Sequence, residues 1–135
     1  ATWANERCYA MRLLGKSHEE LGHDFEAQKW YRLACAEAPN TREPWVDLAM
    51  FGYRRSLWLE SYSSALQALE IKDKAAFYTM DPSVWTEKPY DLASIAAWKL
   101  GHKEEARQLC LKALEFAKDD LRLLKNLELM TEKAT

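Results

Sequence analysis

The 135-residue sequence is poor in the residues that make tight turns, with four glycines and four prolines. A β-sandwich or β-barrel needs many Gly- and Pro-rich turns, so this scarcity favours helices. Although 48% of the residues are hydrophobic, no apolar run approaches the roughly 20 residues that cross a bilayer. The formal net charge of −2 lacks the basic excess on which non-specific nucleic-acid binding depends. The length suits one globular domain, predicted to have no membrane span and no nucleic-acid partner.

Cysteine is also scarce, since only Cys8, Cys35 and Cys110 are present and no C-x-x-C pair occurs. An odd number of widely spaced thiols indicates neither a disulfide framework nor a zinc site. A free cysteine among helix-forming residues usually serves as a small buried apolar group. We therefore expect three buried thiols and a cytoplasmic location, because the cytosol keeps thiols reduced.

Patterns that carry chemistry are missing as well. There is no G-x-x-x-x-G-K-[ST], G-x-G-x-x-G or H-E-x-x-H motif in the chain. His18 and His23 lie five residues apart and His102 lies elsewhere, which is no metal-ligand spacing. Asp119 and Asp120 are better explained as acids that cap a helix. The sequence predicts no catalytic residue, no metal and no cofactor.

The chain does contain an internal repeat. The stretch LGHDFEAQKWYRLACAEAP (21–39) resembles LGHKEEARQLCLKALEFAK (100–118), with alanines at matching places. The offset of 79 residues is one step of 34 plus one step of 45. A period of 34 belongs to the tetratricopeptide (TPR) repeat, a helix-turn-helix unit. The first copy has small and aromatic residues at the spacing of that signature: Gly15, His18, Gly22, Ala27, Tyr31, Ala34 and Pro39.

This resemblance implies an all-α solenoid of about three TPR-like repeats. We expect the repeats at 8–41, 42–75 and 87–120, an insertion at 74–85 and a capping helix at 120–132. The second repeat is degenerate, because Ser56 and Ser61 stand where Gly and Ala are expected. The helices are predicted at 4–21, 24–37, 42–55, 58–72, 87–100, 103–117 and 120–132.

Two matching pentapeptides, TREPW (41–45) and TEKPY (86–90), mark helix starts in this scheme. Thr41 and Thr86 are predicted to be N-caps whose hydroxyls accept a free backbone N–H. Pro44 and Pro89 then fall in the first turn, where no helical hydrogen bond is lost.

By resemblance to the TPR family, the first helix of each repeat lines a concave inner face. The residues predicted to bind a partner there are Arg12, Lys16, Met50, Tyr53, Arg54, Ile95, Trp98 and Lys99. Such a mixture of aromatic, apolar and cationic side chains suits a peptide, a helix or another domain. The alternative is that Tyr53 and Trp98 pack against the insertion or a neighbouring repeat.

One familiar use of the TPR fold is a two-carboxylate clamp for the acidic C-terminus of chaperones, which needs Lys and Asn at set inner places. Arg12 and Lys16 resemble part of that clamp. Val46 and Leu92 stand where polar residues would be needed, so the match is incomplete.

A closer resemblance covers about residues 39–129. The motifs R-E-P-W (42–45) and P-x-D-L-A-S-x-A (89–96), with Tyr53, Trp58, Tyr78 and Trp85, resemble the helical repeat region C-terminal to family 2 glycosyltransferases of bacteria and their phages. This resemblance implies an accessory domain whose catalytic partner precedes Ala1. The D-x-D motif of such transferases is absent here, so none of their catalytic residues can be placed on this chain.

Three functional hypotheses follow. The leading one is a non-catalytic interaction or scaffold module that is part of a larger glycosyltransferase and contacts a protein, a peptide or the catalytic domain itself. The second is a free-standing TPR adaptor that binds a peptide or helix in its concave groove. The third is an enzyme or sugar-binding domain that uses the aromatic residues of the insertion, because aromatic rings can stack on sugars.

Overall fold

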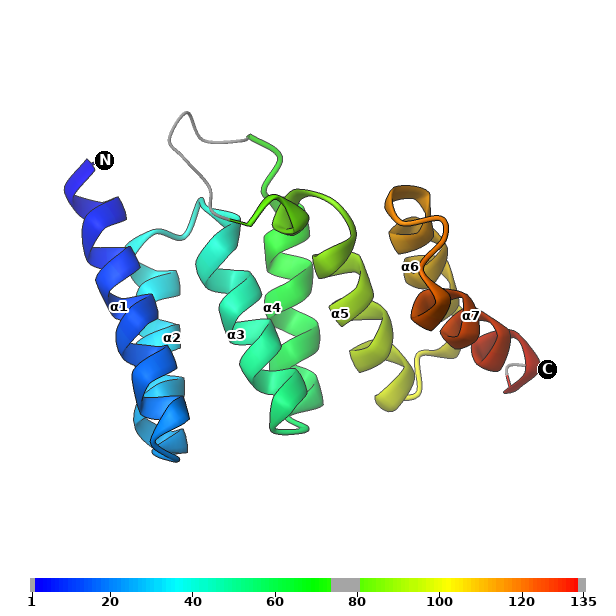
Figure 1. The fold of residues 1–135 in the computed structure, drawn as a ribbon, viewed down its shortest axis with the longest axis horizontal. Helices are drawn as coiled ribbons and strands as arrows, with labels where there is room; N and C mark the ends of the chain where they lie inside the picture. The colour runs from blue at the N-terminus through cyan, green and yellow to red at the C-terminus, as the bar shows by residue number, and fades with distance from the viewer. Residues whose placement is uncertain (1, 74–80, 134–135) are drawn as a thin grey trace.

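The computed structural model of the protein describes residues 2–73 and 81–133, and all of their regular structure is helical. Three helix pairs follow one another along the chain, and a seventh α-helix closes the row (Figure 1). The pairs and the last helix are α1 (Thr2–Glu20) with α2 (Asp24–Glu37), α3 (Arg42–Arg54) with α4 (Trp58–Glu70), α5 (Glu87–Lys99) with α6 (Lys103–Phe116), and α7 (Leu121–Lys133). No helix within these described ranges is long and apolar enough to cross a membrane.

The predicted all-helical solenoid is therefore confirmed, and each observed helix end lies within two residues of its predicted position. The exact limits of the three repeats stay a prediction. Of the predicted insertion, residues 74–80 lie outside the described residues. Its remainder contains a short 3-10 helix, η1 (Pro82–Trp85), which begins where the Asp81 carboxylate accepts a hydrogen bond from the Ser83 N–H at 3.1 Å.

The turns within the helix pairs share one backbone feature. Gly22 and Gly101 have positive φ angles of 79° and 90°, in the region where glycine alone pays no steric penalty. Ser56 lies at the same place in the second pair and has a φ of 57°. The degenerate second repeat thus keeps the turn geometry although it has lost the glycine.

Small residues allow the paired helices to approach closely. Ala27, Ser61 and Ala106 correspond to one another by the repeat spacing, and all three are fully buried. At Gly52, an added Cβ would lie 2.8 Å from the backbone nitrogen of Ser61, so α3 and α4 are nearly in backbone contact. The three cysteines are buried and free, as predicted, and burial raises the pKa of the Cys8 thiol to about 11.

The threonine N-caps were predicted wrongly. Thr41 does precede α3, but its hydroxyl donates backwards to the Ala38 carbonyl at 2.9 Å and caps no helix N–H. Thr86 precedes α5 and donates to the Glu87 carboxylate at 2.8 Å instead. In each case the side-chain rotamer that reaches this acceptor leaves the helix N–H groups without a bond to the hydroxyl oxygen. Of the two acids predicted to cap the last helix, Asp120 is confirmed, because its carboxylate accepts from the backbone N–H of Arg122 at 2.9 Å.

Candidate functional site

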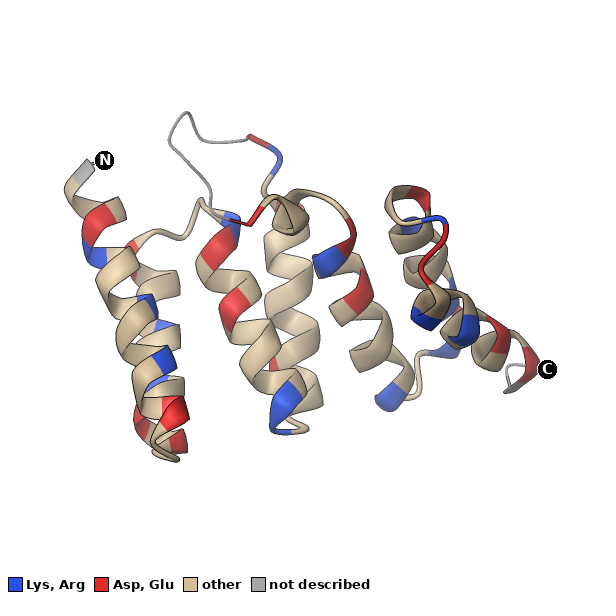
Figure 2. Ribbon diagram, in the orientation of Figure 1, with Lys and Arg blue, Asp and Glu red and all other residues tan. Residues whose placement is uncertain are grey.

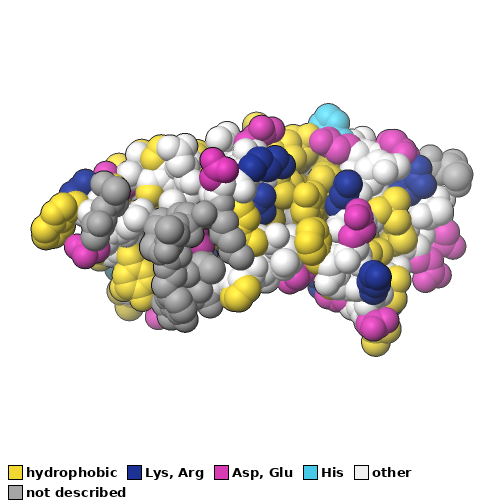
Figure 3. All heavy atoms as spheres, turned by 90° about the horizontal axis from the view of Figure 1, so that it is seen from above, with side chains coloured by type: hydrophobic (Ala, Val, Ile, Leu, Met, Phe, Trp, Pro, Cys, Tyr) yellow, Lys and Arg dark blue, Asp and Glu magenta, His cyan; other side chains and the backbone are white. Residues whose placement is uncertain are grey.

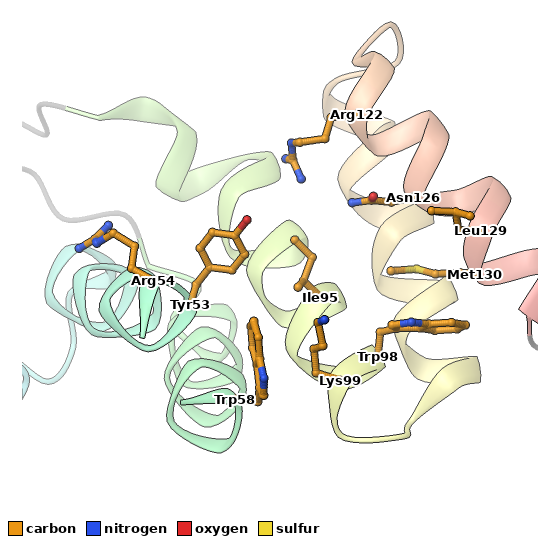
Figure 4. A pocket seen from close by; sticks show the side chains of 10 residues that line it. All are labelled: Tyr53, Arg54, Trp58, Ile95, Trp98, Lys99, Arg122, Asn126, Leu129 and Met130. Atoms are coloured by element: carbon orange, nitrogen blue, oxygen red, sulfur yellow. The ribbon is translucent and has the colours of Figure 1, made fainter. Parts of the chain in front are cut away.

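One concavity of the described surface lies between the second helix pair and the last helices. It has a volume of about 530 Å³ and is lined by α3, α4, α5 and α7 (Figure 4). We call it the aromatic groove; its residues are Tyr53, Arg54, Trp58, Ile95, Trp98, Lys99, Arg122, Asn126, Leu129 and Met130.

Its walls are largely aromatic and aliphatic. The rings of Tyr53 and Trp58 meet edge to face with centroids 6.1 Å apart, and Ile95 lies beside them (Figure 4). On the other side, Trp98 extends from α5 toward Met130 of α7. Tyr53 is 39% exposed and Leu129 is 45% exposed, so apolar surface remains open to solvent. In Figure 3 hydrophobic side chains lie next to Lys and Arg on the upper surface of the molecule.

All charged residues that line this groove are cations. The Arg54 guanidinium donates two hydrogen bonds to the Glu19 carboxylate, at 2.7 and 2.8 Å, and Arg122 forms a bidentate pair with Asp91. The Lys99 ammonium lies 5.4 Å from the centre of the Trp58 ring, and no carboxylate among the described residues pairs with it. The groove therefore offers an uncompensated positive charge beside an aromatic wall.

A second pocket, of about 340 Å³, lies on the side of α1 and is lined by charged side chains of both signs together with apolar ones. Arg12 donates to the Asp47 carboxylate at 2.6 Å, and the Lys16 ammonium lies 3.8 Å from the same oxygen. At its edge Lys88 pairs with Asp81 at 2.7 Å. Because the chain's own carboxylates face these cations, we call it the ion-paired pocket.

The eight predicted partner-binding residues are thus divided between two concavities. Tyr53, Ile95, Trp98 and Lys99 line the aromatic groove, while the ion-paired pocket is lined by Arg12, Lys16 and Met50. Arg54 lines both. The two regions are neighbours, with Arg54 at the boundary.

Sequence reasoning missed half of the aromatic groove. The TPR resemblance assigns the inner face to the first helix of each pair, so it leaves out Trp58, which begins the second helix of its pair. The residues of α7 were predicted to form a cap and nothing more. The spacing of Arg122, Asn126 and Leu129, four and three residues apart, places them on one helix face and could have indicated a second role for this helix.

The positions that correspond to the two-carboxylate clamp hold buried or ion-paired residues. Val46 and Leu92, which occupy two of its positions, are buried in the core. Arg12 and Lys16, which occupy others, face Asp47.

Metal-ligating side chains do not gather in the described ranges: no group of three or more His, Cys, Asp or Glu residues there could hold an ion. His18 lies in the last turn of α1 and His23 directly precedes α2, with their Nδ1 atoms 3.2 Å apart.

No family model and no curated protein matches the sequence. Solved structures do resemble the fold. The first TPR of Spaghetti (RPAP3) bound to HSP90 peptide SRMEEVD has a TM-score of 0.79 and 16% sequence identity, over 96% of this chain and 94% of that one. The first TPR domain of the human RPAP3 protein has a TM-score of 0.74 and 17% identity, over 93% and 91% of the two chains. Together with the repeat spacing, this likeness shows that the chain has the fold of a TPR domain.

Proposed function

We propose that this domain is a protein–protein interaction module whose aromatic groove binds a short segment of a partner protein. The segment presents one large apolar side chain next to carboxylates. The observation that carries the proposal is the lining itself: partly exposed aromatic and aliphatic side chains, three cations and no acid.

The apolar part of the proposal follows from the exposed wall. The volume of about 530 Å³ falls within the roughly 300–1,000 Å³ of typical ligand pockets. Tyr53 and Leu129 are each more than one-third exposed, so a partner side chain that covers them gains burial on both surfaces. Full burial of one large apolar side chain is worth about 1.5–3 kcal/mol.

The acidic part follows from the charges. Arg54 and Arg122 have carboxylate partners, which leaves Lys99 as the cation with an unmatched charge. An incoming carboxylate beside Lys99 would meet no acid in the groove. The peptide SRMEEVD, bound to the structurally similar first TPR of Spaghetti (RPAP3), supports such chemistry, because it combines a methionine with three acidic residues.

The narrower proposal, that the domain is an accessory part of a family 2 glycosyltransferase, rests on the sequence resemblance. Buried residues of its shared motifs, such as Pro44, Leu92 and Ser94, lie in α3 and α5, so these parts of the motifs serve packing. Sequencing the gene upstream of the Ala1 codon tests it. A reading frame for a nucleotide-binding α/β domain with D-x-D would support it, and an initiator codon directly before Ala1 would leave the free-standing adaptor.

The groove itself is tested by selection from a random peptide display library, followed by titration of synthetic copies of the selected peptides. We expect sequences with a large apolar residue and neighbouring acids. Tyr53→Ala should weaken their binding at least about tenfold, because the exposed ring forms one wall of the groove. Lys99→Gln should weaken it less, and the loss should shrink as salt is raised.

The matched control is Leu59→Ala in α4, which removes a 68% exposed side chain outside the groove. It should leave peptide affinity unchanged. Tyr53 is preferred to Trp98 for truncation because Trp98 also packs against the buried cluster around Cys110. Peptides that bind Tyr53→Ala and wild type equally would contradict the assignment of the groove.

A further inference from the structure

An exposed aromatic side chain lies outside the groove, at the start of α2. Phe25 is 76% exposed, and none of the buried clusters or ring contacts of the described residues includes it. It stands between Asp24 and Glu26 in the first turn of the helix. Across the turn, Leu21 is also highly exposed. We call these four residues the tip: Leu21, Asp24, Phe25 and Glu26.

The tip carries the acidic groups that the aromatic groove lacks. It offers a phenyl ring flanked by two carboxylates, whereas the groove offers aromatic walls, cations and no acid. Figure 2 shows the same contrast: acidic residues gather at the lower ends of α1 and α2, and basic residues lie at the lower ends of α3 and α5. Asp24 pairs with Arg55 at 2.9 Å, so Glu26 is the tip carboxylate without an ion pair among the described residues.

The tip does not line the groove of its own molecule. It lies on the first helix pair, whereas the groove is lined by α3, α4, α5 and α7, and α7 closes the opposite end of the row (Figure 1). In this fold, a contact that places Phe25 in the groove therefore joins separate molecules.

We propose that the aromatic groove accepts the tip of a second copy of this chain, with Phe25 between Tyr53 and Leu129 and Glu26 near Lys99. This rests on the proposed function, namely that the groove takes an apolar side chain with adjacent carboxylates. The contact joins two different surfaces, so each added copy leaves one tip and one groove free and chains can grow.

The strength of this contact is limited by its size. One phenyl ring and one charge pair supply only part of the free energy that a micromolar complex requires. We therefore expect a dissociation constant of about 0.1–1 mM. At high local concentration the tips compete with a partner segment for the groove.

Sedimentation velocity between about 10 µM and 1 mM tests the proposal. The average mass of wild type should rise with concentration, and Phe25→Ala should keep the monomer mass throughout. Leu59→Ala is the matched control, because Leu59 holds the same second position in α4 and is 68% exposed; it should associate as wild type does. Wild type that stays monomeric at 1 mM, or Phe25→Ala that associates like wild type, would overturn the proposal.

A mixing experiment identifies the two surfaces. Phe25→Ala keeps the groove, and Leu129→Glu keeps the tip while it adds an acid to the groove. Each variant alone should stay monomeric, and their equimolar mixture should form pairs and nothing larger. If Leu129→Glu alone, and Lys99→Glu alone, still associate like wild type, the tip does not bind in the groove.

The result can be separated from the proposed function. Selected peptides that bind the groove while wild type remains monomeric would sustain the proposed function and remove self-docking. Peptides that bind the groove and dissociate the self-associated wild type would support both the proposed function and self-docking. Self-association that depends on Phe25 and Leu129, with no peptide selected from the library, would support self-docking and count against a separate partner.

Discussion

The side-chain hydroxyl of Ser94 in α5 donates a hydrogen bond to the main-chain carbonyl of Ala106 in α6, at 2.7 Å. In the preceding helix pair the direction is reversed, because Ser61 of α4 donates to the Ala49 carbonyl of α3 at 2.9 Å. Positions 49 and 94 correspond by the repeat offset, as do 61 and 106. The serine can therefore lie on either helix of the pair, because the close crossing has room for a small side chain such as serine or alanine at each position.

These bridges should contribute measurably to stability. Both serines are buried, so replacing either with alanine leaves a main-chain carbonyl in the interior without this donor. We expect Ser61→Ala and Ser94→Ala each to lower the free energy of unfolding by about 1 kcal/mol. Urea unfolding at neutral pH measures it. Ser63→Ala on the exposed face of α4 is the control, and an equal loss there would contradict a role for the bridges.

Ser56 is expected to be a site of stored backbone strain. Its φ of 57° lies in the left-handed region, which costs a residue with a Cβ roughly 1–2 kcal/mol. Ser56→Gly should therefore stabilise the protein by about 1 kcal/mol, after the added flexibility of glycine in the unfolded chain is subtracted. The same substitution at Ser63, within α4, should instead destabilise. A shift in the same direction at both sites would contradict the strain argument.

The sequence predicted the helix positions because each repeat solves one steric problem with the same residue types. A glycine or serine at the turn and an alanine or serine at the crossing recur at fixed spacing. The sequence alone therefore places Gly22, Ser56 and Gly101 at the same position of successive repeats. The threonine caps could not be predicted, because the side-chain rotamer decides whether the hydroxyl oxygen can accept from a helix N–H, and the sequence does not fix that rotamer. The Thr41 hydroxyl donates to the Ala38 carbonyl and accepts from no helix N–H.

The groove was predicted only in part for a different reason. Its composition depends on how successive helix pairs are rotated against each other, and no local pattern encodes that rotation. The pairing of Arg12 with Asp47 joins residues 35 positions apart, so the sequence alone left Arg12 as an apparent ligand-binding cation. The residues that α7 adds to the groove likewise depend on the orientation that the turn between α6 and α7 gives this helix.

Arg42 should be the most sensitive charged residue. It is 6% exposed, donates to the carbonyls of Ile71 and Val84 at 3.0 Å each, and lies over the Trp85 ring at 4.3 Å. It thus ties the end of α4 to η1. Arg42→Met keeps the stem but leaves two carbonyls without their donor, so we expect a loss of about 3 kcal/mol in the free energy of unfolding.

The control for Arg42 is Arg32→Met. Arg32 is exposed and pairs with Glu60 at 2.9 Å, and an exposed pair is worth about 0–1 kcal/mol. Chemical denaturation of both variants measures the difference. Equal losses would show that Arg42 acts as an ordinary surface cation.

Glu19 should make stability depend on acid pH. Its carboxylate accepts hydrogen bonds from Arg54 and, at 2.9 Å, from the Tyr31 hydroxyl, and Arg55 lies 3.4 Å away. The Arg54 hydrogen bonds, chiefly, hold the pKa of Glu19 below its usual 4.5. A lowered pKa in the folded state means that this stabilisation is fully present above pH 4.5 and is lost as the pH falls through the folded-state pKa.

The variant Glu19→Gln removes that titration. At pH 7 it should be less stable than wild type, and the difference in unfolding free energy should shrink steadily as the pH is lowered from about 5 toward 3, because wild type loses the same interaction on protonation. Glu20→Gln, at the exposed neighbouring position, should differ little from wild type at any pH. A Glu19→Gln deficit that stays constant down to pH 3 would mean that the side chain contributes through its packing and not through its charge.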